Sequence, residues 1–198
     1  MSKREIAEQT RLAFEFIQKL YLEVSYLIKE IEGLLSTEKE EFVIGRSGGY
    51  AITGIRSLGL EANIVNSWPL RKMSVFFVPK QATKYSQGIT ITKFEKNPKI
   101  IYLRILLDDK GLAEPMAVLG VLHSFVGKKF EKVEQVMAHI EYNDTKVFGD
   151  GKNILDHEDG YVQFKGHLLE VNLFDITSSE DVSSKLLEPI LKIYREKT

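Results

Sequence analysis

The sequence contains no cysteine, and this absence excludes disulfide bonds, thiolate metal ligands and cysteine nucleophiles together. It has no apolar run near the roughly 18 residues that suggest a membrane-spanning helix. The opening stretch MSKREIAEQTR lacks the apolar core of a secretory signal peptide. We therefore expect a cytoplasmic protein without a membrane segment.

The sequence also lacks an excess of either sign of charge, since the formal net charge is only −1 over 198 residues. Overall charge therefore indicates no class of partner. The two signs are nevertheless separated along the chain, because residues 69–104 are rich in lysine and arginine whereas residues 141–181 are rich in acids. A basic segment and an acidic segment cancel in the total.

The N-terminal residues have the pattern of one long amphipathic helix. Ser2 and Glu5 form a capping box, in which each side chain satisfies the other residue's free backbone amide. Apolar residues then recur in heptads, with β-branched residues at a and mostly leucine at d, which favours two parallel strands in a coiled coil. The e positions are apolar too, and so wide a stripe is typical of a helix packed on a larger core. One edge of the stripe can pack on the body of the protein while the other edge packs on a second copy. We expect self-association through these residues of the heptad: Ile17, Leu20, Val24, Leu27 and Ile31.

The period of the sequence changes after this helix. Segments rich in β-branched and aromatic residues predict antiparallel strands, because the links between them are too short for helical crossovers. Helices are predicted at 113–127, from Pro115 and Gly127 at its ends, and at 130–142, running into a strand. Residues 161–176 predict a last strand or hairpin, and a capping box at Thr177–Glu180 opens a final helix that Pro189 should kink or split. The six strands are predicted at 41–44, 50–56, 62–68, 73–79, 88–94 and 99–107.

These elements indicate an α+β fold, with a mostly antiparallel sheet packed against a long N-terminal, a middle and a C-terminal helix. We divide the chain into an N-terminal helix (residues 1–36), which is a candidate for dimerisation, and a single α+β domain (residues 37–198).

The stretch Gly45-Arg46-Ser47-Gly48-Gly49 matches G-x-S-x-G, the pattern around a nucleophilic serine. A nucleophile elbow needs a helix after the serine, and here the following residues favour a strand. All four histidines follow Ser47 in the chain, which is the wrong order for the chymotrypsin type. We interpret the stretch as a hairpin turn and keep Ser47 only as the alternative catalytic residue.

The basic segment contains the candidate binding residues. Its cations are interleaved with aromatic residues, and single-stranded nucleic acid is bound by cations on its backbone and rings on its bases. The competing interpretation is that the rings are core and the lysines solvate the outer face. The candidates for an anionic ligand are Arg71, Lys72, Lys80, Lys84 and Tyr85.

The acidic segment contains the alternative metal site, made of Asp156, His157, Asp159 and His167. No histidine pair has helical metal-ligand spacing, so a solvated acidic loop is the competing interpretation. The sequence identifies no cofactor. It favours a dimeric, non-enzymatic binding or regulatory protein whose β-rich body binds a small ligand or an anionic partner, nucleic acid included. The alternative is a small hydrolase or metal-dependent nuclease that uses Ser47 or the acidic cluster.

Overall fold

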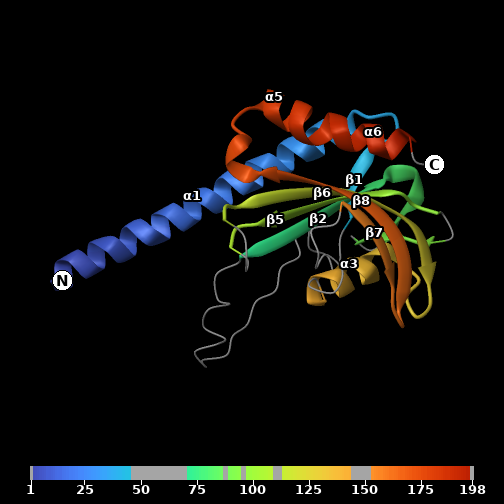
Figure 1. Cartoon of the computed structure of the whole chain (residues 1–198), viewed down its shortest axis with the longest axis horizontal. Coiled ribbons are helices and arrows are strands. Elements are labelled where there is room, and N and C mark those ends of the chain that lie inside the picture. The colour runs from blue at the N-terminus through green and yellow to red at the C-terminus, as the bar shows by residue number, and fades with distance from the viewer. Residues whose placement is uncertain are drawn as a thin grey trace.

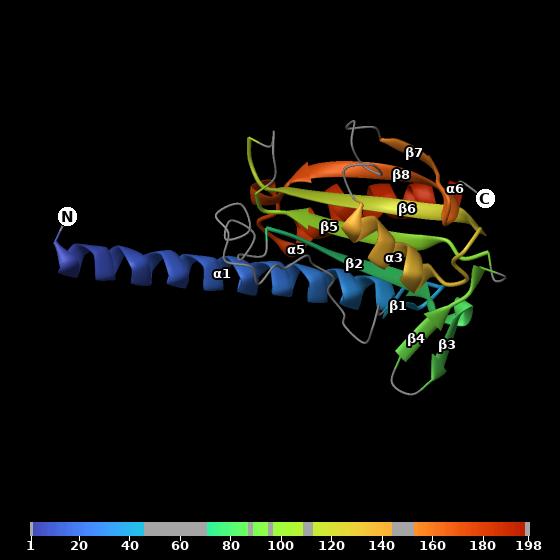
Figure 2. The same cartoon turned by 90° about the horizontal axis from the view of Figure 1, so that it is seen from below.

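The computed structural model describes residues 2–45, 71–86, 89–94, 97–108, 113–143 and 153–196. Within these residues, a six-stranded antiparallel sheet has helices on both faces, and a separate two-stranded hairpin lies beside it (Figures 1 and 2). The predicted α+β class is confirmed. In the described part of the chain, no helix has the length and apolar character needed to cross a membrane.

The sheet has the strand order β1-β2-β5-β6-β8-β7, and every neighbouring pair is antiparallel. The small hairpin pairs β3 (Thr83–Ser86) with β4 (Ile89–Thr92), and a short 3-10 turn, η1 (Lys80–Ala82), precedes it. The six strands are β1 (Phe42–Gly45), β2 (Lys72–Pro79), β5 (Ile100–Leu106), β6 (Met116–Gly127), β7 (Ile154–Glu158) and β8 (Val162–Asn172).

Helices cover both faces of the sheet, and each face therefore builds its own hydrophobic core. Along β2, Val75 and Phe77 belong to the core beneath α1 (Lys3–Ser36) and the C-terminal helices, whereas Phe76 and Val78 belong to the core beneath α3 (Val133–Tyr142). Figure 1 shows α1, α5 (Ser179–Asp181) and α6 (Glu188–Glu196) on one side of the sheet and α3 on the other. A strand buried on both faces is apolar at nearly every position and loses the alternation of a half-exposed strand.

This double burial explains why the helix predicted at 113–127 is wrong. The segment is the long strand β6, which lies between β5 and β8. A continuous apolar run does not distinguish a buried strand from a buried helix by its period. Pro115 precedes the strand, where a missing amide is tolerated, and its carbonyl accepts the amide of Leu173 at 2.9 Å.

Other boundaries also differ from the prediction. Residues 133–142 are helical to the end, because Val133, Val136, Met137 and Ile140 are spaced to bury one helical face. Residues 162–172 form the single strand β8, followed by a 3-10 turn, η3 (Leu173–Asp175).

The C-terminal helix begins one residue later than the predicted capping box, since the Ser178 hydroxyl accepts the amide of Asp181. The predicted interruption near Pro189 takes the form of a π-helical segment, η4 (Val182–Leu187), immediately before α6. A proline cannot donate to the preceding turn, and a wider turn before it accommodates the missing bond.

Candidate functional site

The N-terminal helix is longer than the body that it packs on. Its buried residues begin at Val24, whereas every residue from Ser2 to Phe16 is exposed. Figure 2 shows this part of α1 extending away from the sheet. We call residues 2–16 the overhang. The Ser2–Glu5 capping box closes its free end as predicted, with the Ser2 amide donating to Glu5 Oε2 at 2.6 Å.

The overhang exposes large apolar side chains. Phe14 and Phe16 are 63% and 64% exposed, and Ile6 and Leu12 are about half exposed. Isolated exposed apolar residues need no explanation, but a contiguous set indicates an interaction surface. Nothing among the described residues of this chain covers them.

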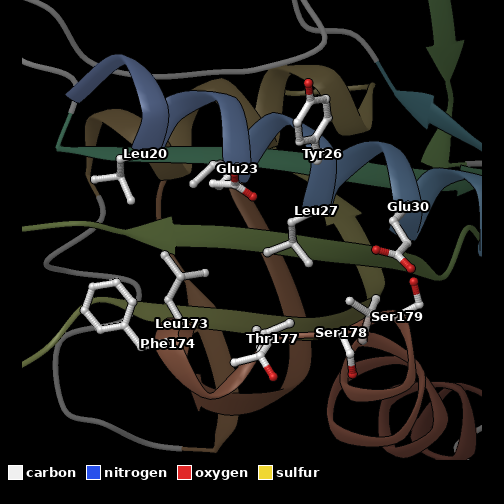
Figure 3. A pocket seen from close by; sticks show the side chains of 13 residues that line it. Leu20, Glu23, Tyr26, Leu27, Glu30, Leu173, Phe174, Thr177, Ser178 and Ser179 are labelled. Atoms are coloured by element: carbon white, nitrogen blue, oxygen red, sulfur yellow. The ribbon is translucent and has the colours of Figure 1, made fainter. Parts of the chain in front are cut away.

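A groove continues from the overhang along the body. It has a volume of about 520 Å³ and lies between α1 and the segment from η3 to η4. Leu20, Leu27 and Leu173 give it an apolar floor, and Glu23, Glu30 and Ser178 are among its polar lining residues. Figure 3 shows Leu27 directed toward the opposite wall, whereas Tyr26 points away from it.

Local hydrogen bonds shape the far wall of the groove. The Asn172 side chain accepts the amide of Phe174 at 2.9 Å, and the turn leaves Phe174 58% exposed. Asp181 accepts from the amide and the hydroxyl of Thr177 at 3.0 and 2.9 Å. The Lys185 ammonium and the Thr177 amide hold the pKa of Asp181 well below its usual value. These hydrogen bonds tie the far wall to the start of the C-terminal helices.

The structure divides the residues predicted for self-association. Val24, Leu27 and Ile31 are buried in the chain's own core, which is the packing that the wide stripe indicated. Ile17 and Leu20 are half-buried and lie where the helix leaves the body. Of the five residues predicted for self-association, Ile17 and Leu20 are thus the two that the chain's own core does not bury.

The basic segment is partly neutralised within the chain. Lys80 Nζ lies 2.5 Å from Glu41 Oε2, and Arg71 lies 3.2 Å from Asp108. Lys72 is half-buried, whereas Lys84 is exposed on β3. The backbone of Tyr85 pairs with Thr90, and its side chain lies outside the described residues. Among the candidate cations that the structure describes, Arg71 and Lys80 are therefore paired with acids, and Lys84 is exposed.

The predicted metal residues do not form one cluster. On β7, Asp156 is exposed and lies 3.6 Å from Lys165. His167 pairs with Ile154 and stacks on His123 with ring centroids 6.2 Å apart. His157 alternates with Asp156 along the strand, so the two side chains lie on opposite faces of the sheet. Asp156 and His167 are therefore separated from His157 and Asp159.

The structure instead adds a histidine that the sequence analysis missed. Nε2 of His139, in the last turn of α3, lies 2.6 Å from Oδ2 of Asp159, and Nε2 of His157 lies 3.2 Å from the same oxygen. Oδ1 of Asp159 accepts the amides of Tyr161 and Val162 at 2.7 and 2.9 Å. His139 had no motif signal, because it lies in a different element from the other two residues.

The charge state of Asp159 follows from these contacts. Burial opposes ionisation, but the amides of Val162 and Tyr161 and the two histidines together hold the pKa of Asp159 well below its usual value. The carboxylate is thus ionised at neutral pH between two imidazole rings. Aromatic rings of Phe130, Tyr161 and Phe164 pack against these imidazoles.

Ser47 and the predicted strands at 50–56 and 62–68 lie outside the described residues. No protein-family model, curated protein or solved structure matches this chain.

Proposed function

We propose that this chain is a non-enzymatic binding protein that assembles with a second copy of itself through α1. The overhang of one copy occupies the groove of the other. The observation that carries the proposal is the exposure of every residue from Ser2 to Phe16, two phenylalanines included.

The overhang continues the heptad that the second half of α1 uses to pack on its own core. Ile6 and Ala13 precede Leu20 at intervals of seven, so they extend the same face. Phe14 and Phe16 flank this face at the e and g positions, where a two-stranded coiled coil commonly has charges. So wide a stripe suits a groove between two elements better than a single partner helix.

The groove and the overhang form one continuous track. Leu12, Phe16 and Leu20 are spaced by four residues and share a helical face, and Leu20 lines the groove. The overhang is about 22 Å long and the groove section of α1 is about 16 Å long, at 1.5 Å per residue. An antiparallel arrangement around a twofold axis near Ile17 covers both overhangs by the same contact.

The apolar area is of the right size for a dimer. The exposed side chains are Ile6, Leu12, Phe14 and Phe16 of the overhang and Phe174 of the groove. At roughly 100 Å² for each, two copies offer on the order of 1,000 Å² of apolar surface. Stable interfaces bury about 1,200–2,000 Å² in total, and the polar residues of the groove supply the remainder.

Light scattering tests the assembly directly. We expect a mass near twice the monomer's 22.6 kDa at micromolar concentration. Phe14→Glu combined with Phe16→Glu should give a monomer with unchanged circular dichroism. Leu22→Glu is the matched control, because Leu22 is 48% exposed on the opposite face of α1 and should leave the dimer intact. A monomeric wild type would overturn the proposal.

The absence of cysteine allows a second test. Ile17→Cys should crosslink to a covalent dimer with a short bismaleimide, because the proposed axis passes near this residue. Gln18→Cys lies about 100° around the helix and should crosslink far less. Equal crosslinking of both variants would exclude the proposed register.

An anionic partner of the body is a second part of the proposal, and exposed Lys84 and Lys93 are its candidate contacts. Lys84→Glu should weaken binding of a single-stranded oligonucleotide and reduce its dependence on salt. If the wild type shows no binding at low salt, this part of the proposal is wrong while the assembly is unaffected.

A further inference from the structure

We propose that His139, His157 and Asp159 form a binding site for a divalent transition-metal ion, with Zn²⁺ as the first candidate. Two imidazole nitrogens and one carboxylate oxygen are a donor set that zinc accepts. The site joins the end of α3 to the turn between β7 and β8, on the opposite face of the sheet from the groove. It is therefore independent of the proposed assembly.

The three donor atoms are already close enough to share one ion. One ligand atom from each of His139, His157 and Asp159 lies within 4.8 Å of the other two, and both Nε2 atoms contact Oδ2 of Asp159. Two ligands of a tetrahedral zinc ion, at bond lengths of about 2.0–2.1 Å, are about 3.3 Å apart. The His157–Asp159 distance of 3.2 Å meets this value, and the His139–Asp159 distance of 2.6 Å requires a small opening.

The carboxylate is held in the orientation that a ligand needs. Its Oδ1 accepts two backbone amides, and its Oδ2 faces the two imidazoles. Second-sphere hydrogen bonds of this kind orient metal ligands and reduce the reorganisation required on binding.

His157 contributes a second buried donor to the cluster. Its Nε2 is shielded from solvent and lies 3.2 Å from Oδ2 of Asp159, the same oxygen that His139 contacts. One carboxylate oxygen is thus shared by two imidazoles. A metal ion at the centre of the cluster would give each imidazole nitrogen a bond of its own.

His139 requires one adjustment. A ring that binds metal through Nε2 carries its proton on Nδ1 and needs an acceptor there. The Asn143 amide nitrogen lies 3.3 Å from Nδ1 and donates to the carbonyl oxygen of His139 at 3.1 Å, so it must move away from Nδ1 when the ring binds a metal. Because Asn143 contacts both the ring and the backbone of His139, we assign it as the positioning residue for this ligand.

A fourth ligand would complete the coordination of a bound ion. The three side chains provide three ligands, and Asp159 is the most exposed of them at 27%. Water, or a small anion such as phosphate, would complete a tetrahedron. The rings of Phe130 and Tyr161 pack against His139, and the ring of Phe164 packs against His157.

Calorimetric titration of the chelator-treated full chain with ZnCl₂ tests the site. We expect one ion per chain, and Co²⁺ should give the visible absorption of a four- or five-coordinate site. His139→Ala and His157→Ala should each abolish the absorption. His167→Ala is the matched control, because His167 lies on β8 outside the cluster, and it should bind as the wild type does.

Two further variants keep the test decisive if the alanine variants fold poorly. Asp159→Asn preserves an oxygen for the two amides and should weaken zinc binding by more than tenfold without loss of fold. Asn143→Ala should weaken binding by about tenfold and leave one ion per chain. Wild-type affinity in Asp159→Asn, or loss of binding in His167→Ala alone, would overturn the proposal.

Discussion

Nε2 of His139 lies 2.6 Å from Oδ2 of Asp159, and this contact connects α3 to the turn between β7 and β8. The other oxygen of Asp159 accepts the amides of Tyr161 and Val162, so one carboxylate fixes both the turn and the helix. Residues 20 positions apart in sequence are thereby held together on one face of the sheet.

Substitutions of Asp159 should separate these two roles in metal-free protein. Asp159→Asn keeps an acceptor for the two amides and loses the charged partner of the histidines, whereas Asp159→Ala loses both. We expect urea denaturation at neutral pH to show the wild type as the most stable, Asp159→Asn as less stable and Asp159→Ala as the least stable. The alanine variant should lose about 1–3 kcal/mol. Equal stability of the two variants would show that the turn does not depend on the side chain.

Glu134 should make stability depend on pH. Burial raises the pKa of this carboxyl, against the opposing amide of Thr92, which donates to it at 2.9 Å. Folding therefore favours the protonated form of Glu134. The contribution of this form to the free energy of unfolding is complete below the ordinary pKa of 4.5, and it is lost as the pH rises through the pKa of the carboxyl in the folded protein.

Glu134→Gln cannot ionise and should keep this contribution. The melting temperature of the variant relative to wild type should increase from about pH 4 to pH 7. Glu131→Gln, at an exposed neighbouring position, is the control and should show a constant difference. A pH-independent difference for Glu134→Gln would mean that folding does not shift the pKa of this carboxyl.

Local signals in the sequence predicted local structure well. The Ser2–Glu5 capping box and the heptad gave the long helix and its buried face, because both depend on residues within a few turns. The helix predicted at 113–127 is wrong because the burial of β6 on both faces depends on the packing of α1 and α3 against the sheet, which no local pattern records. The same reason explains the missed His139, which joins the site only through the packing of α3.

Gly127 should tolerate no side chain. A Cβ at this position would lie 2.0 Å from the carbonyl oxygen of Phe130 and 3.0 Å from the ring of Phe94. Gly127→Ala should therefore lower the free energy of unfolding by about 1–3 kcal/mol, measured by urea denaturation. Gly160→Ala is the control, since a Cβ there meets no atom within 4 Å. Equal effects of both substitutions would contradict the close approach of the chain at Gly127.

The two leucines of α1 that face the groove should respond differently to lysine. Leu27 is 8% exposed and belongs to the core beneath the sheet, whereas Leu20 is half-buried where the helix leaves the body. A charge at position 27 must be buried or must displace the helix, so Leu27→Lys should remove most of the cooperative thermal transition. Leu20→Lys can extend its ammonium into solvent and should keep the fold while disrupting the dimer.

Circular dichroism melting and light scattering on both variants separate the core of α1 from its interface. A folded monomer for Leu20→Lys and an unfolded chain for Leu27→Lys would place the boundary between residues 20 and 27. If both variants unfold, Leu20 belongs to the core, and the surface for a second copy begins nearer the N terminus. If Leu20→Lys remains a folded dimer, the groove is not the docking surface, because a charge in its wall would then have no effect on assembly.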